Sequence, residues 1–289
     1  MRCPKCQKIL RLANEIIEKN QLTYNPATRL LERRSNVQAS DLSCLACGHI
    51  LTISEAEGFG LKNFGVSARA AFGTEFYKIY ASAPDIYHEF SLAEDPDGVL
   101  TERILEYCQP DTTVLDVGSG SGKLSRALAA SVSTVYALEP SSSLLDFSLK
   151  QSKDAGIENV IHLLASAEDV PLPEQSVDLV TMTWTAMCPY ETLTQVTRVL
   201  KPGGYAIRVG ASTKDELTSL YPDVDSEAFS RTNSWFEGKG FQTSRTTIRI
   251  VFKSIAAAQR VMGTIVGAPI MLDTNVLNHE VVFQVYRHL

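Results

Sequence analysis

The run VLDVGSGSG at residues 114–122 constrains the fold of this chain more than any other feature. An apolar segment, TTVLDV, leads into three alternate glycines, and a helical pattern, LSRALAAS, follows them. Glycine lets a backbone bend tightly and approach a neighbouring group closely. The run therefore predicts a buried strand, a tight turn and a helix whose unpaired N-terminal N–H groups face the turn.

The rest of residues 99–289 alternates in the same manner. The strand-like segments are TTVLDVG, STVYALE, VIHLLA, VDLVTMT, GYAIRVG, TTIRIVFKS and EVVFQVYRHL, and the helical patterns between them include SSLLDFSLKQSKDAG, YETLTQVTRVL, EAFSRTNSWFEGKG and AAAQRVMGTIVG. Strands that alternate with helices predict an α/β fold with a doubly wound, mainly parallel sheet. The last two strands are close in sequence and could form an antiparallel edge.

Two shorter segments precede this region in the 289-residue chain. Residues 1–58 begin and end in pairs of cysteines and form the first predicted unit. Residues 59–98 hold a Gly-rich stretch and then an aromatic helical pattern that is broken near Pro84. We interpret residues 59–98 as a helical linker that caps the site built by residues 99–289.

Charge is distributed unevenly along the chain. Residues 1–40 hold eight Lys/Arg and three Asp/Glu, a balance of +5, which leaves −11 for the remainder of a chain whose net charge is −6. The acidic remainder argues against wide non-specific binding to nucleic acid, although the basic segment could still form a local patch that binds nucleic acid. No stretch is apolar enough for a signal peptide or a membrane helix, so we expect a cytoplasmic protein without a membrane partner.

The paired cysteines predict a metal site, because thiols stay reduced in the cytoplasm. Cys3, Cys6, Cys44 and Cys47 form two C-x-x-C turns, and four thiolates arranged in this way suit structural Zn²⁺. Redox chemistry is the alternative for a single C-x-x-C pair. The two other cysteines of the six are expected to pack as small apolar residues.

The glycine turn could hold a dinucleotide or S-adenosylmethionine, and two details favour the second. Its third glycine, Gly122, comes one residue too early for G-x-G-x-x-G. Asp116 precedes Gly118, Ser119 and Gly120, and a carboxylate there suits a cationic ligand better than a pyrophosphate. At the end of the next strand, Glu139 is placed to accept the two hydroxyls of a ribose.

With these motifs, residues 99–289 resemble the class I S-adenosylmethionine-dependent methyltransferases, particularly the small-molecule branch that includes ubiquinone-biosynthesis enzymes. VLDVGSGSG resembles the first motif of that family, ASAEDVPLPEQSVDLV a second and RVLKPGGYAI a third. The resemblance implies a Rossmann-like fold, with Ser166, Ala167 and Glu168 near the adenine. Ser166 replaces the usual aspartate, which weakens that contact. The residues from Lys201 to Gly204 are expected to form a structural turn.

Several further residues are candidates for the same site. In this fold the tip of the strand VDLVTMT lies over the cofactor, so Thr183 is expected to contact it and Trp184 to line the place of methyl transfer, with ordinary packing as the alternative for Trp184. Tyr80, together with Tyr77 and Tyr87, could close over the methionine moiety or simply pack against the sheet. His88 is a candidate general base, although the sequence favours a surface position for it.

Residues 1–58 resemble zinc ribbons that precede some methyltransferases, including those of the 23S rRNA guanine methyltransferases and of a small activator protein of translation-factor and RNA methyltransferases. The leading hypothesis is methyl transfer to a small molecule. The second is rRNA or tRNA methylation, with the basic ribbon holding the RNA. The third is a non-catalytic module that binds S-adenosylmethionine. Because methyl transfer needs mainly proximity and orientation, the sequence alone designates no catalytic residue.

Overall fold

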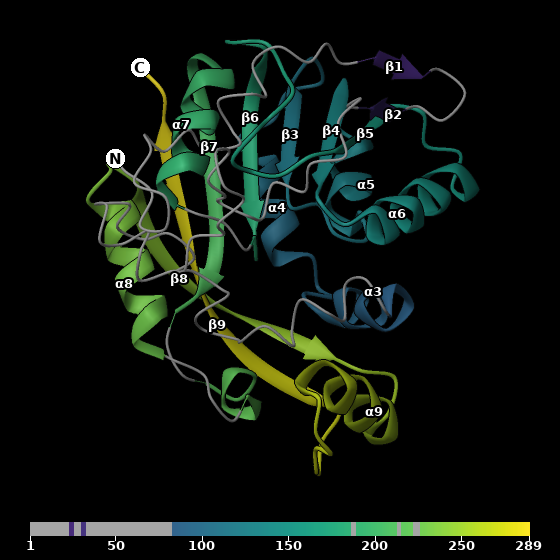
Figure 1. Cartoon of the computed structure of the whole chain (residues 1–289). Helices are drawn as coiled ribbons and strands as arrows, with labels where there is room; N and C mark the ends of the chain where they lie inside the picture. Colours follow the sequence, from purple (N-terminus) through teal and green to yellow (C-terminus); the bar gives the residue numbers. More distant parts are fainter. Residues whose placement is uncertain (1–22, 26–29, 33–82, 186–188, 213–214, 222–225) are drawn as a thin grey trace, which may run out of the picture.

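The computed structural model describes residues 23–25, 30–32, 83–185, 189–212, 215–221 and 226–289. In these ranges one sheet of nine strands has the order β1-β2-β5-β4-β3-β6-β7-β9-β8 (Figure 1). Its strands are β1 (Thr23–Asn25), β2 (Leu30–Glu32), β3 (Thr113–Val117), β4 (Thr134–Glu139), β5 (Val160–Leu164), β6 (Val177–Thr183), β7 (Leu200–Ala211), β8 (Gln242–Val251) and β9 (Val276–Arg287).

The five central strands run parallel, as the alternating pattern predicted. β5, β4, β3, β6 and β7 form consecutive parallel pairs. β9 then pairs antiparallel with both β7 and β8, which confirms the expected antiparallel edge. At the opposite edge, β2 pairs parallel with β5 and β1 pairs antiparallel with β2. The sequence did not predict β1 or β2, which lie in the segment interpreted as a ribbon.

Helices cover both faces of the sheet (Figure 1). They are α3 (Pro84–Ala93), α4 (Val99–Leu105), α5 (Lys123–Ala129), α6 (Ser142–Asp154), α7 (Pro189–Val199), α8 (Ser226–Glu237) and α9 (Ile255–Val266). Side chains of β3 alternate between two cores: Val114 packs with α4 and α5, whereas Leu115 packs with α7 and α8. Burial of both faces explains why the parallel strands are apolar runs without a polar face.

A third core holds α3 beyond the ends of the parallel strands. Phe90 of α3, Met262 of α9 and Ile250 of β8 belong to this cluster. Arg260 of α9 also pairs with Glu89 of α3, with its guanidinium nitrogen 2.7 Å from the carboxylate. β8 and β9 extend past the other strands to reach α9, and α3 lies opposite the carboxyl ends of the parallel strands (Figure 1).

Two local predictions are sharpened by the structure. The helical pattern broken near Pro84 corresponds to α3, which begins at Pro84 itself. The expected turn at Lys201–Gly204 lies within β7 and not before it, because Leu200 already pairs with Val177 while Tyr205 pairs with Leu179. These four residues form a bulge opposite Asp178. The predicted boundary near residue 58 lies outside the described residues.

Candidate functional site

The glycine turn after β3 requires glycine at each of its three positions. Gly118, Gly120 and Gly122 have φ angles of 70°, 55° and 76°, which L side chains rarely adopt. A Cβ on Gly118 would lie 2.8 Å from Thr185 Cγ2, and one on Gly120 would lie 2.9 Å from a ring carbon of Tyr87. The turn is therefore packed on both sides as well as tightly bent. α5 begins directly after it, as predicted.

Asp116 lies beneath this turn with both carboxylate oxygens engaged. Oδ2 accepts a hydrogen bond from Ser125 Oγ at 2.5 Å, and Oδ1 accepts one from Thr181 Oγ1 at 2.9 Å. Burial raises the pKa of the Asp116 carboxyl, while these two hydrogen bonds act in the opposite direction. The carboxylate thus ties β3 to α5 and β6. Its predicted contact with a cationic ligand stays a prediction.

Glu139 joins the second parallel strand to the glycine turn. Its Oε2 accepts the Gly120 N–H at 3.0 Å, and its Oε1 accepts the Ser141 N–H at 2.9 Å. Burial raises the pKa of Glu139 to about 7, against the effect of these two N–H donors. Each carboxylate oxygen has a second lone pair. Glu139 can therefore accept further hydrogen bonds from ligand hydroxyls while it holds the turn.

Three predicted site residues carry buried hydroxyl oxygens that have no hydrogen-bond partner. They are Ser119 in the turn, Ser166 after β5 and Thr183 at the end of β6. Buried hydroxyls are normally paired, so three orphans at the carboxyl ends of strands in one parallel sheet indicate a place for a polar ligand. Ala167, the predicted neighbour of the adenine, is buried, and Glu168 beside it is half-buried.

α3 brings two of the predicted residues onto the turn. The ring of Tyr87 packs on Gly120, and burial followed by the charges of nearby carboxylates raises the pKa of its hydroxyl. His88 Nδ1 lies 2.9 Å from Ser121 Oγ, and burial, with Arg126 next, lowers the pKa of its imidazole. His88 is thus held against the turn in a half-buried position, and its role as a general base stays a prediction. Tyr77 and Tyr80 lie outside the described residues.

A cluster beyond Trp184 was missed by the sequence analysis. The Trp184 indole stacks on the His279 ring with centroids 4.9 Å apart, and its N–H donates to the Glu94 carboxylate. His279 Nδ1 lies 2.5 Å from Asp215 Oδ2. Glu94 and Trp184 directly follow α3 and β6, Asp215 lies in the segment after β7, and His279 belongs to β9. No motif or spacing connects them, and only Trp184 carried a local signal, its place after a buried strand.

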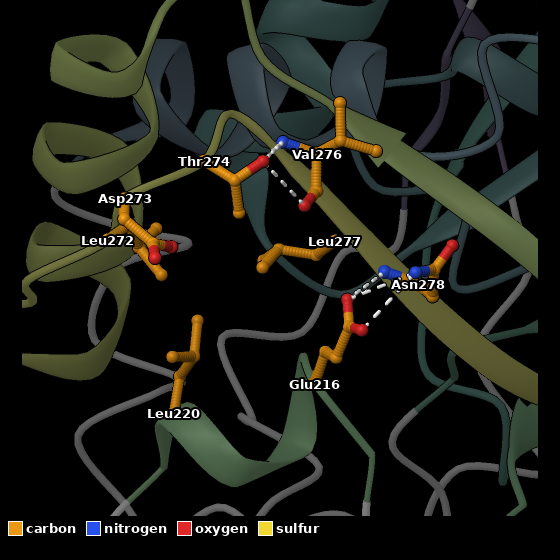
Figure 2. A pocket seen from close by; sticks show the side chains of 8 residues that line it. All are labelled: Glu216, Leu220, Leu272, Asp273, Thr274, Val276, Leu277 and Asn278. Carbon is orange, nitrogen blue, oxygen red and sulfur yellow. Dashed lines mark hydrogen bonds between the residues drawn. The ribbon is translucent and has the colours of Figure 1, made fainter.

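A separate pocket of about 560 Å³ is lined in part by Leu277 and Asn278 of β9. Figure 2 shows Glu216 and Asn278 on one side of this pocket and Leu272, Asp273 and Thr274 on another. The Glu216 carboxylate accepts the Asn278 N–H at 2.7 Å. None of the lining residues belongs to the glycine turn or carries an orphaned polar atom. The chemistry therefore assigns the functional site to the turn and not to this pocket.

The remaining predictions concern metal and membrane. Cys3, Cys6, Cys44 and Cys47 lie outside the described residues, so the predicted zinc site stays a prediction. Within the described ranges, no group of three or more His, Cys, Asp or Glu could hold a metal ion. Among the helices that the structure describes, none is both long and apolar enough to cross a membrane.

Comparison with known proteins identifies the region that carries the turn. Residues 115–208 match the sequence model of a family described as a methyltransferase domain. This finding and the relatives below support the predicted resemblance to class I S-adenosylmethionine-dependent methyltransferases.

Curated relatives match a little over a third of the chain. An uncharacterized methyltransferase of Mycobacterium tuberculosis is 37% identical over 107 residues, which are 36% of this chain and 41% of that protein. A demethylmenaquinone methyltransferase of Symbiobacterium thermophilum is 35% identical over 112 residues, 36% of this chain and 44% of that protein. The chain therefore spans less than half the length of these relatives.

A solved structure shows that the fold extends further than the sequence match. The crystal structure of a putative methyltransferase from Bacillus halodurans covers 66% of this chain and 99% of its own, with a TM-score of 0.50 and 18% sequence identity. At this identity the likeness establishes the Rossmann-like fold alone. The predicted fold class is thereby confirmed for the sheet and its helices.

Proposed function

We propose that this protein is an S-adenosylmethionine-dependent methyltransferase that acts on a small-molecule acceptor. The observation that carries the proposal is the set of orphaned buried hydroxyls of Ser119, Ser166 and Thr183 beside a glycine turn that Glu139 holds. A ligand with a ribose, an adenine and an amino acid moiety offers polar partners to such a set. The residues present therefore fit this cofactor.

Each part of the site has a distinct task in this proposal. Glu139 accepts the ribose hydroxyls, and the turn lets the ligand approach the backbone closely. Ser166 and Ala167 border the adenine, while Ser119 and Thr183 bond polar groups nearer the methionine moiety. When bound, the cofactor supplies a methyl group activated by a sulfonium, so the protein must mainly orient the acceptor and exclude water.

The charge of the site favours a small acceptor over RNA. Glu94, Glu139 and Asp215 place three carboxylates at the carboxyl ends of the strands, and the cations beside the glycine turn are Lys123 and Arg126. A phosphate backbone would be repelled by such an edge. The similarity to a demethylmenaquinone methyltransferase agrees with this assignment. We extend the proposal to a structural zinc ion on the four paired cysteines.

The cofactor site is tested by a serine substitution that should leave the fold intact. Ser119→Ala removes an orphaned hydroxyl, so the free energy of unfolding should stay equal or rise slightly. Affinity for S-adenosylmethionine, measured by calorimetry, should fall about fivefold, since one hydrogen bond contributes roughly 1 kcal/mol. Ser152→Ala is the matched control, because Ser152 is also buried and orphaned but lies near the far end of α6.

Two outcomes would contradict the assignment of the cofactor site. One is equal affinity in Ser119→Ala, Ser152→Ala and the wild type, and the other is wild-type protein that binds no S-adenosylmethionine at all. Acceptor class is tested by incubating the protein with labelled S-adenosylmethionine and either a small-molecule cell extract or total RNA. We expect label in the small-molecule fraction. Label in RNA alone would establish the alternative acceptor, and label in neither, despite binding, a non-catalytic module.

A further inference from the structure

Glu94 stands between the glycine turn and the C-terminal strands. It follows α3 directly and pairs with Ile250 of β8 through an isolated bridge. Lys123, the residue after the glycine turn, donates a hydrogen bond from Nζ to the Glu94 backbone carbonyl. The backbone of Glu94 is thus tied both to β8 and to the start of α5. Its side chain is held at the carboxyl edge, close to the proposed cofactor site.

Trp184 is a hydrogen-bond partner of the Glu94 carboxylate. The indole N–H donates to this carboxylate, and the Trp184 backbone N–H donates to Val209 O at 3.1 Å. Trp184 has a φ of 57°, a left-handed conformation that costs roughly 1–2 kcal/mol for a residue with a side chain. Surrounding contacts must impose such a conformation, and it often occurs at functional sites.

His279 and Asp215 supply those contacts from the opposite side. The His279 ring stacks on the indole at an interplanar angle of 29°. Asp215 Oδ2 holds His279 Nδ1 and also accepts the Glu280 N–H at 2.8 Å. The ring of His279 is therefore fixed to the backbone of β9 through Asp215. This chain of contacts positions Trp184, and through it the carboxylate of Glu94.

Tyr87 connects this cluster to the cofactor end of the site. Its ring packs on Gly120, whose N–H is bound by Glu139. Burial raises the pKa of the Tyr87 hydroxyl, and the charges of Glu94 and Glu139 raise it further. Tyr87 therefore contacts the glycine turn and interacts with both carboxylates. We expect an acceptor at this end of the site to contact Trp184 and Glu94.

We infer that Glu94 is the proton acceptor of the methyl transfer, and that the acceptor substrate offers a hydroxyl or an N–H nucleophile. The inference rests on the proposed function. As the nucleophile forms its bond to the methyl carbon, the carbon–sulfur bond breaks, its electron pair stays on sulfur, and the nucleophile's proton passes to a Glu94 oxygen. Trp184, His279 and Asp215 are positioning residues, because they act through the orientation of Glu94.

The surroundings of Glu94 suit this task near neutral pH. Burial raises the pKa of Glu94 to about 7, and a base works best when its pKa lies near the working pH. The groups that face it oppose one another: the Lys123 ammonium and His279 lower its pKa, and Asp95 raises it. Tyr87 and Tyr221 are the other titratable neighbours, and burial followed by the charge of Glu94 raises the pKa values of both hydroxyls.

The fluorescence of Trp184 can report the protonation of Glu94 without cofactor or acceptor. Trp235 is the chain's other tryptophan, so a Trp235→Phe background leaves Trp184 as the sole indole emitter. Its fluorescence should change with a midpoint near pH 7, as the carboxylate that receives its N–H gains or loses a proton. The transition should disappear in Glu94→Gln. It should persist in Glu89→Gln, a control on the same helix whose carboxylate pairs with Arg260.

Activity then separates this inference from the proposed function. With labelled S-adenosylmethionine and a small-molecule cell extract at pH 8, Glu94→Gln should slow methyl transfer about 100-fold or more. Its affinity for S-adenosylmethionine should stay close to that of the wild type, and Glu89→Gln should transfer label normally. The labelled product should carry the methyl group on oxygen or nitrogen.

The contrary results are distinct. Transfer by Glu94→Gln at the wild-type rate, a pH transition that Glu94→Gln retains, or a product labelled on carbon or sulfur would each overturn the role of Glu94 while the cofactor site stands. Wild-type protein that binds no S-adenosylmethionine would overturn the proposed function and this inference with it.

Discussion

Replacement of Glu139 by glutamine should change the stability of this protein in opposite directions at low and high pH. In the wild type, the two carboxylate oxygens accept the Gly120 and Ser141 N–H groups. Glutamine has the same shape but only one acceptor oxygen, so one N–H loses its partner. It also cannot ionise. The variant therefore lacks the buried titratable carboxyl and leaves one backbone N–H without an acceptor.

The size of each effect follows from the structure. The folded-state pKa of Glu139 is about 7 and the ordinary value is 4.5, so the folded protein holds this proton more tightly than the unfolded chain. The contribution of Glu139 to the free energy of unfolding is largest below pH 4.5 and is lost as the pH rises through 7. The loss is about 3 kcal/mol, because each tenfold difference in proton affinity between the folded and unfolded states corresponds to ~1.4 kcal/mol. The unsatisfied N–H of the variant costs roughly 1–3 kcal/mol at any pH.

Urea unfolding at pH 5 and pH 8 measures both effects. At pH 5 the Glu139→Gln protein should be less stable than the wild type by the cost of the unsatisfied N–H, roughly 1–3 kcal/mol. At pH 8 it should be as stable as the wild type or up to about 2 kcal/mol more stable, because the ionised carboxylate is gone. Glu158→Gln, at an exposed glutamate before β5, should change neither value by more than about 0.5 kcal/mol. An equal difference between Glu139→Gln and the wild type at the two pH values would refute this reasoning.

Two further predictions concern the glycine turn and the paired cysteines. Gly120→Ala should lower the free energy of unfolding by about 3 kcal/mol, because the backbone there is left-handed and the new Cβ meets Tyr87. Gly156 is also left-handed but has no atom within 4 Å of a new Cβ, so Gly156→Ala should lose only about 1 kcal/mol in the same urea titration. Equal losses in the two variants would exclude packing of Tyr87 on Gly120 as the cause. Protein purified without chelator should contain about one zinc ion per chain by metal analysis, and Cys44→Ser should lower that content; metal-free wild-type protein would rule out the predicted site.

Local patterns predicted the central sheet because each strand is short, apolar and buried on both faces. The glycine turn and Glu139 were predictable for the same reason, since each lies next to a strand end. Asp116 was recognised, but its two hydroxyl partners come from Ser125 and Thr181, and no local rule pairs residues so far apart. His88 was uncertain from sequence because nothing near it in the chain indicates that it meets Ser121. The hydrogen bonds of Asp116 and His88 join different helices and strands, and hydrophobic periodicity does not predict which residues of different elements meet.

The two ends of the site differ in how they are built. Gly118, Glu139 and Thr183 lie within residues 115–208, the part that matches the methyltransferase family, and they come from consecutive parallel strands. Glu94 and His279 lie outside that range, on elements positioned by the packing of α3 and α9 against β8 and β9. The family model therefore covers the strands that carry the proposed cofactor site and leaves out the residues of the proposed acceptor site. Under the proposed function, substitutions at Glu94, Trp184 and His279 are therefore the direct test of which acceptor this protein takes, beyond what the family match indicates.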